Sequence, residues 1–202
     1  MTSIQIDTGF GPARAELHCA EEGIAVLMLG HGAGGGIQAK DLVAVTRAAQ
    51  GAGVHVALVE QPYRVAGRRA PAPARQLDES WLTVADEVSA RFDGLPLVFG
   101  GRSSGARVAC RTASAGQAVA VLALAFPEHP PGKPEKSRQF ELDAVEVPAL
   151  IVQGERDPFG VPKPGHHHEL VMLAGDHNLS ADLEGVSRAA AEWLGRVLRP
   201  LA

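Results

Sequence analysis

The stretch Leu97-Val98-Phe99-Gly100-Gly101-Arg102-Ser103-Ser104-Gly105 decides how this sequence folds. It begins with apolar residues suited to a buried strand and ends in the pattern G-x-S-x-G, formed by Gly101, Ser103 and Gly105. A helix is expected directly after it, over Ser104 to Ser114. A serine on a sharp turn from strand to helix exposes its hydroxyl, and glycines on either side relieve the crowding there. The stretch therefore predicts that Ser103 is a nucleophile.

A nucleophilic serine also needs hydrogen-bond donors for the oxyanion that forms during acyl transfer. The residue after the nucleophile, Ser104, offers a free backbone N–H at the start of the expected helix. A glycine-rich segment, LGHGAGGG over residues 29–36, follows an earlier apolar run and lets the backbone approach a substrate closely. We therefore expect the N–H groups of Ala33 and Ser104 to form an oxyanion hole.

Two later segments carry the acid and the base that activate such a serine. Asp157 follows the apolar run Ala149–Val152, and His177 follows the run Glu169–Leu173. Serine, acid and histidine in this order, each after a strand, are typical of the α/β-hydrolase fold. Glu155 and Asp176 are rival acids, and we choose Asp157 because Pro158 and Gly160 shape a turn around it.

Apolar runs alternate with helical patterns along most of the chain, which indicates a mostly parallel sheet with helices on both faces. Two shorter runs at the start are expected to form an antiparallel lead-in. A helix bearing Trp81, Ala85 and Val88 is expected to begin at Ser80, which can cap it. The expected strands are Ser3–Asp7, Ala13–Leu17, Ile24–Leu29, Val54–Val59, Leu95–Phe99, Val119–Ala125, Ala149–Val152 and Glu169–Leu173, and the other helices are Lys40–Gln50, Ser104–Ser114 and Leu183–Leu198.

The glycine-rich segment supports a second interpretation. Gly30, Gly32 and Gly35 satisfy G-x-G-x-x-G, and Glu60 stands at the end of the next strand, where an acidic residue would bind a ribose. This pattern alone would indicate a dinucleotide-binding enzyme. It leaves the antiparallel lead-in, the Ser103 turn and the loops of Asp157 and His177 unexplained, so we rank it lower.

Two Pro-rich segments, Pro62–Leu77 and Pro127–Arg138, are expected to be loops at the edge of the sheet where open α/β sheets bind ligands. The first contains Arg68 and Arg69, which we interpret as solvated rather than as a grip for an anionic substrate. Three adjacent histidines, residues 166–168, are interpreted as a partly exposed strand edge, because no Cys, Asp or Glu stands nearby at zinc-ligand spacing.

Composition narrows the class of protein further. A chain of 202 residues with 46% hydrophobic and 21% charged residues is an ordinary globular chain that can bury one core. A net charge of −4 gives no reason to expect nucleic acid or an anionic membrane as a partner. We see no signal peptide and no apolar run of membrane-spanning length, and the two cysteines form no framework. We therefore expect reduced thiols and a cytoplasmic protein.

Taken together, the motifs resemble a group of small α/β hydrolases related to dienelactone hydrolase, which includes KANL-type and testis-expressed-type proteins of animals. The resemblance spans about Gly30 to the C-terminus and rests on LGHGAGG at 29–35, GRRAP at 67–71, GGRSSGARVA at 100–109, HPPGKPEKSR at 129–138, GERDPFG at 154–160 and GDHNL at 175–179. It implies Ser103 as nucleophile, Asp157 as acid and His177 as base. Such families more often have a bulky residue where this chain has Ser104, which affects the shape of the pocket.

The sequence thus predicts one α/β-hydrolase domain over residues 1–202, with about seven or eight strands and little or no lid. The expected activity is hydrolysis of a small-molecule acyl ester through an acyl-enzyme, with no metal or organic cofactor. The oligomeric state stays open. The main alternative is a non-catalytic interaction protein that keeps this fold and binds a partner through the two Pro-rich segments.

Overall fold

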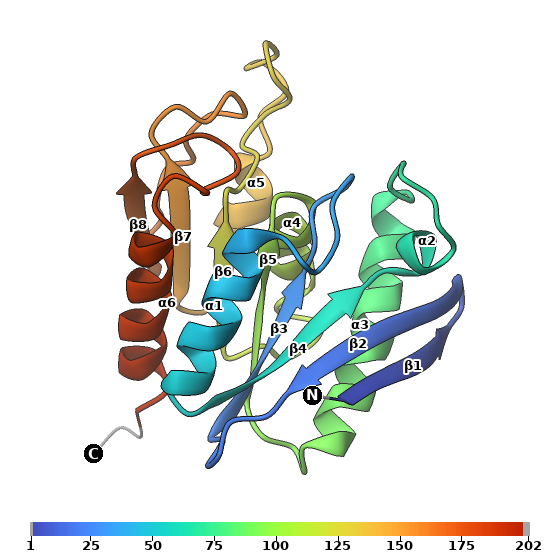
Figure 1. Ribbon diagram of the computed structural model, residues 1–202. Coiled ribbons are helices and arrows are strands. Elements are labelled where there is room, and N and C mark those ends of the chain that lie inside the picture. The colour runs from blue at the N-terminus through green and yellow to red at the C-terminus, as the bar shows by residue number, and fades with distance from the viewer. Residues whose placement is uncertain (1, 200–202) are drawn as a thin grey trace.

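The apolar runs form one central sheet in the computed structural model, which describes residues 2–199 (Figure 1). The strand order within the described residues is β1-β2-β4-β3-β5-β6-β7-β8. All strands from β4 to β8 in this order are parallel, whereas β2 pairs antiparallel with β4 and with β1. The expected antiparallel lead-in is confirmed. The strands are β1 Thr2–Thr8, β2 Gly11–His18, β3 Ala25–Gly30, β4 Val54–Glu60, β5 Leu97–Arg102, β6 Ala120–Leu124, β7 Ala149–Gly154 and β8 His168–Leu173.

Helices cover both faces of the sheet. On one face, α1 (Lys40–Gly51) and α6 (Leu183–Val197) lie side by side, and on the other lie α3 (Ala74–Arg91), α4 (Ser104–Thr112) and α5 (Gln139–Asp143) (Figure 1). Each face has its own buried cluster, centred on Trp193 under α6 and on Trp81 under α3. The strands that lie between the two clusters are buried along nearly their whole length, as strands covered on both sides must be; they are β3, β4, β5, β6 and β7. This mixed sheet with helices on both faces is the predicted α/β-hydrolase fold.

The segment Pro62–Leu77 is not wholly a loop, contrary to the prediction. It contains a short helix, α2 (Pro62–Val65), and the first turn of α3, which begins at Ala74. Pro73 occupies the position before the helix, where its missing N–H and fixed φ cost nothing. The prediction that Ser80 caps this helix is therefore wrong: Ser80 is buried inside α3 and contacts Thr8.

The second Pro-rich segment, Pro127–Arg138, forms turns and no helix, as predicted. Its ends are joined because the Arg138 N–H donates to the Glu128 carbonyl at 2.6 Å. The loop is tied to the neighbouring loop after β7 by a bond of 2.9 Å from the His129 N–H to the Phe159 carbonyl. Its exposed tip, residues 131–137, projects from the carboxyl edge of the sheet (Figure 1).

Of the three adjacent histidines, only His168 lies in the edge strand β8, and His166 and His167 form a turn before it, contrary to the prediction of a strand edge for all three. His166 and His167 are exposed, and His168 donates from Nε2 to the Val145 carbonyl at 3.0 Å. Within residues 2–199, no group of three or more His, Cys, Asp or Glu side chains is arranged to hold a metal ion. No helix in that range is both long and apolar enough to cross a membrane.

Candidate active site

The turn from β5 to α4 places Ser103 at the carboxyl edge of the sheet. Its backbone has φ 53° and ψ −111°, a conformation that L-residues adopt only where the surrounding structure forces it. The turn fits because glycine lies where α4 crosses β3: a Cβ on Gly105 would stand 2.3 Å from the Gly30 carbonyl oxygen. Ser104 is the first residue of α4, so its N–H is one of the free donors at that helix start.

Hydrogen bonds connect the three predicted residues in series. The Ser103 hydroxyl lies 2.8 Å from Nε2 of His177, and Nδ1 of His177 lies 2.8 Å from Oδ2 of Asp157. Since an ionised carboxylate only accepts, the imidazole proton belongs on Nδ1, which leaves Nε2 free to accept from the serine. This is the geometry that a general base requires.

The carboxylate of Asp157 is fully buried and bonded through both oxygens. Oδ1 accepts from the Phe159 N–H at 2.8 Å, and Oδ2 accepts from Nε2 of Gln153 at 2.8 Å besides its bond to His177. The ring of Phe159 also stacks on the imidazole, with 4.1 Å between ring centroids. The imidazole is thus fixed by one carboxylate at its edge and one aromatic ring on its face.

The rival acids lie elsewhere. Asp176 is exposed, and its Oδ1 accepts from the backbone N–H of Asn178 at 2.9 Å, which makes it part of the turn and not a partner of the imidazole. Glu155 is exposed in the loop after β7. Of the three candidate acids, Asp157 is the one within hydrogen-bond distance of His177.

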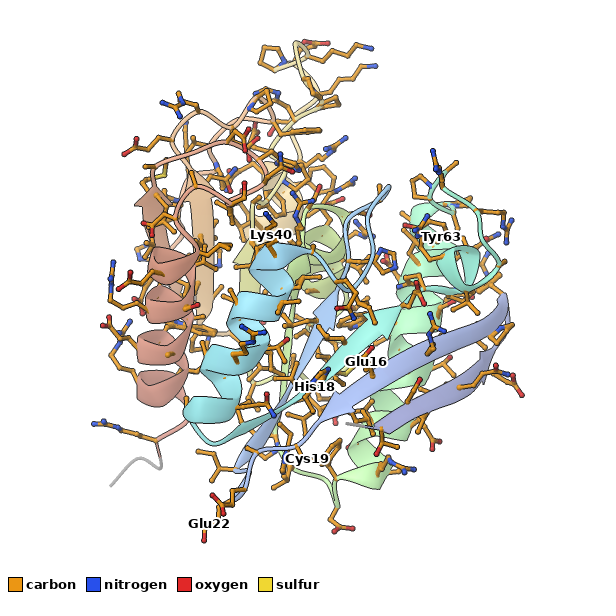
Figure 2. All side chains as sticks on the ribbon, in the orientation of Figure 1. Glu16, His18, Cys19, Glu22, Lys40 and Tyr63 are labelled. Carbon is orange, nitrogen blue, oxygen red and sulfur yellow. The ribbon has the colours of Figure 1, made fainter. Side chains whose placement is uncertain are left out.

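The segment from His31 to Gly36 follows β3 and leads to α1, and it passes close to the serine turn, because a Cβ on Gly32 would stand 3.6 Å from the Cβ of Ser103. His31 is buried, and burial lowers the pKa of its imidazole, which favours the neutral form. Its Nε2 accepts from the Gln61 N–H at 3.1 Å, and its Nδ1 donates to the Gly32 carbonyl at 2.8 Å. The hydroxyl of Tyr63, labelled on α2 in Figure 2, donates to the Ala33 carbonyl at 2.8 Å. The bonds to the Gly32 and Ala33 carbonyls orient the peptide groups on both sides of Ala33.

Two polar residues of the site were missed from the sequence. Gln153 is buried at the end of β7 and contacts the carboxylate of Asp157. Arg102 precedes the serine, and its Nη2 donates to the His177 carbonyl at 2.8 Å. The sequence does mark both residues: Gln153 is a polar residue at the end of the apolar run ALIVQG, and Arg102 is a charged residue inside G-x-S-x-G.

The family model described as "Alpha/beta hydrolase domain" matches residues 23–186, which is most of the chain. The chain belongs to this α/β-hydrolase family. A comparison with curated protein sequences finds no significant match. Residues 23–186 include the serine turn and the loops of Asp157 and His177, so the matched region contains every residue of the site described above.

Solved structures of the same fold include hydrolases that lack a lid. A serine hydrolase without lid from Xanthomonas campestris has a TM-score of 0.80 and 19% identity, covering 100% of this chain and 96% of the other. Est1E from Butyrivibrio proteoclasticus has a TM-score of 0.82 and 18% identity over 99% and 100% of the chains, and a second structure of Est1E contains ferulic acid. Dienelactone hydrolase from Anabaena variabilis has a TM-score of 0.75 and 17% identity over 96% of both chains. At these identities, the likeness establishes the fold.

The fold is not that of a dinucleotide-binding domain. In that domain the glycines of G-x-G-x-x-G open the helix whose N-terminus binds the pyrophosphate. Here α1 begins only at Lys40, well after Gly35 (Lys40 is labelled in Figure 2). Glu60 forms an ion pair with Arg14 of β2, so its carboxylate is engaged by the antiparallel lead-in.

Proposed function

We propose that this protein is a serine esterase that cleaves short acyl esters through an acyl-enzyme on Ser103. The observation that supports this most is the continuous hydrogen-bond chain from Ser103 through His177 to buried Asp157 on a strained strand-to-helix turn. Residues 1–202 are proposed to act as one domain. Within the family, the motifs given above support membership of the group related to dienelactone hydrolase.

In the proposed mechanism, Nε2 of His177 takes the proton of Ser103 as the serine oxygen attacks the acyl carbon. Asp157 keeps the imidazole in the required tautomer and stabilises its charged form. The N–H groups of Ser104 and Ala33 stabilise the oxyanion of the tetrahedral intermediate. His177 then returns the proton to the departing alcohol. In the second half of the cycle, His177 takes a proton from water as the water attacks the acyl carbon, and it returns that proton to Ser103 as the acid leaves.

The proposed substrates are small because nothing in the described fold roofs the site. Between β6 and β7, where many lipases carry a helical lid, stand a Pro-rich loop and the five-residue helix α5. Each methylene that an apolar roof buries is worth about 0.8 kcal/mol, so without a roof a longer acyl chain gains little. We expect highest kcat/KM for p-nitrophenyl esters of about two to six carbons.

A fluorophosphonate probe tests the nucleophile directly. We expect it to label Ser103 of the wild-type protein, and we expect Ser103→Ala to abolish labelling together with turnover of p-nitrophenyl acetate. Ser104→Ala is the matched control, since it removes a neighbouring hydroxyl and keeps the backbone N–H. Labelling at Ser104, or folded protein that takes no label, would overturn the proposal and favour the interaction protein.

The proposed substrate size is tested by kcat/KM across p-nitrophenyl esters of increasing acyl length. A kcat/KM that still rises beyond about ten carbons would contradict it.

A further inference from the structure

The guanidinium of Arg102 lies between three segments that meet at the site. Its Nε donates to Oδ2 of Asp41 at 2.9 Å, in the first turn of α1. Its Nη2 donates to the His177 carbonyl at 2.8 Å and to Oδ1 of Asn178 at 3.0 Å. Because Arg102 directly precedes Ser103, one cation joins the serine turn to α1 and to the histidine loop.

Asp41 is built to hold this cation in place. Its side chain is 1% exposed, and that of Arg102 is 14% exposed, so the pair is shielded from solvent. Oδ1 of Asp41 accepts from the Leu42 N–H at 2.9 Å, which leaves Oδ2 for the arginine. Burial raises the pKa of Asp41 while the charge of Arg102 opposes that shift. The buried carboxylate of Asp41 and the largely shielded guanidinium of Arg102 therefore depend on one another.

We propose that Arg102, anchored by Asp41, is a positioning residue that fixes the backbone of His177 so that Nε2 stays in reach of the Ser103 hydroxyl. The inference rests on the proposed esterase function. Asp157 and Phe159 hold the imidazole itself. The separation between the loop that carries His177 and the end of β5 must also stay fixed, because Ser103 follows β5. A displacement of about 1 Å can cost on the order of 10²-fold in rate.

The chain offers a matched control in Arg107. Arg107 lies on α4 and binds the carboxylate of Glu141 through Nε at 2.7 Å and Nη2 at 2.5 Å. The side chains of Arg107 and Glu141 are 26% and 3% exposed, so this pair is also largely shielded from solvent, although less than the Arg102–Asp41 pair. None of its bonds reaches the loop of His177. Arg107→Met thus breaks a partly buried ion pair of the same kind, and it keeps the backbone bond of 3.2 Å from the residue 107 N–H to the Ser103 carbonyl.

The experiment compares Arg102→Met, Arg102→Lys, Asp41→Ala and Arg107→Met by the rate of fluorophosphonate labelling and by kcat and KM for p-nitrophenyl acetate. We expect Arg102→Met to lower kcat and the labelling rate by about 10²-fold while KM changes little. Asp41→Ala also lowers kcat and the labelling rate, by a smaller factor. Arg102→Lys recovers part of the rate, because an ammonium can contact Asp41 or the His177 carbonyl but lacks the fork that contacts both. Arg107→Met keeps the wild-type kcat, although it unfolds at a lower temperature.

Hydrogen–deuterium exchange of the peptide spanning residues 176–180 provides a readout that needs no activity. We expect faster exchange in Arg102→Met than in wild type, and no change in Arg107→Met. A wild-type kcat in Arg102→Met, or equal losses of kcat in Arg102→Met and Arg107→Met, would overturn the inference. If the wild-type protein takes no label, the proposed function fails, and unchanged exchange in Arg102→Met would separately refute the positioning role.

Discussion

The two sides of Ser103 are held in different ways. On the side of the proposed base, side chains surround the His177 imidazole: Asp157 lies at its edge and Phe159 on its face. On the opposite side, the glycine-rich segment is fixed near its base by His31 and Tyr63, while Gly34 and Gly35 are exposed. The side of the proposed base thus depends on bonds to the imidazole itself, and the side of the proposed oxyanion hole depends on bonds to backbone carbonyls. Substitutions should therefore cost more on the base side.

The largest effect is expected from Asp157→Asn. An amide at this position can donate to Nδ1 of His177 and so favours the wrong imidazole tautomer. The corresponding substitution in a serine protease lowers kcat by about 10⁴-fold, and we expect a loss of that order for p-nitrophenyl acetate.

Asp176→Asn and Glu155→Gln provide the controls, because both acids are exposed and neither contacts His177. We expect each to keep kcat within about threefold of wild type, as befits exposed substitutions away from the site. A loss at Asp176 comparable to that at Asp157 would show that the acid is misassigned.

A smaller loss on the same side is expected from Gln153→Leu. Gln153 donates from Nε2 to Oδ2 of Asp157 at 2.8 Å and to the carbonyls of Phe126 and Gly160 at 3.2 Å and 2.9 Å. Leucine has a similar size but no donor. The carboxylate would then keep its bonds to His177 and to the Phe159 N–H. One lost bond to a charged group corresponds to about 1.5–3 kcal/mol, or roughly 10- to 100-fold if all of it appeared in kcat. Unchanged kcat in a folded variant would show that Asp157 needs no such support.

On the oxyanion side, Tyr63→Phe removes the hydroxyl that donates to the Ala33 carbonyl and leaves the ring in place. The variant still has the Ala33 N–H, but the peptide group that follows Ala33 loses one of the hydrogen bonds that orient it. We expect kcat to fall by about threefold to tenfold, in line with one neutral hydrogen bond of about 1 kcal/mol. Measured beside Gln153→Leu, a larger loss in Tyr63→Phe would reverse the comparison of the two sides.

The smallest effect concerns stability and pH on the oxyanion side. Burial holds the pKa of folded His31 below the ordinary value of 6.5. As pH falls below 6.5, the unfolded chain takes up a proton at this residue before the folded protein does, so the free energy of unfolding falls. One such group contributes at most about 1.4 kcal/mol per pH unit.

Urea unfolding of wild type and His31→Asn between pH 7.5 and 5 checks this prediction. We expect the stability of wild type to decline more steeply below pH 6.5 than that of the variant, which lacks the titrating group. Parallel curves would show that His31 titrates alike in the folded and unfolded protein.

Much of the fold was predictable because the decisive signals are local. The apolar run and glycines around Ser103 define a strand, a turn and a helix within a few residues, and the loops of Asp157 and His177 follow strands of the same kind. The start of α3 was not predictable in this way. Pro73 was read as part of a loop, whereas proline is also suited to the position before a helix.

The supporting residues were missed for a different reason. Arg102 and Asn178 are 76 positions apart in the sequence, and the bond between Arg102 and Asp41 spans 61 positions. No local pattern marks such pairs, because they form only after the strands have aligned. Gln153 lies close to Asp157 in sequence, but its contact with Asp157 depends on a loop conformation that the sequence does not predict.

The position of the site within the strand order also has a consequence for the synthesis of the chain. Ser103 follows β5 in the middle of the sheet, whereas His177 follows β8 at its edge and precedes α6, which packs on α1. A nascent chain therefore carries the proposed nucleophile long before the proposed base has been made. In the proposed mechanism the serine becomes competent only after the chain has been made past His177, so we expect translation products that end before β8 to carry no esterase activity.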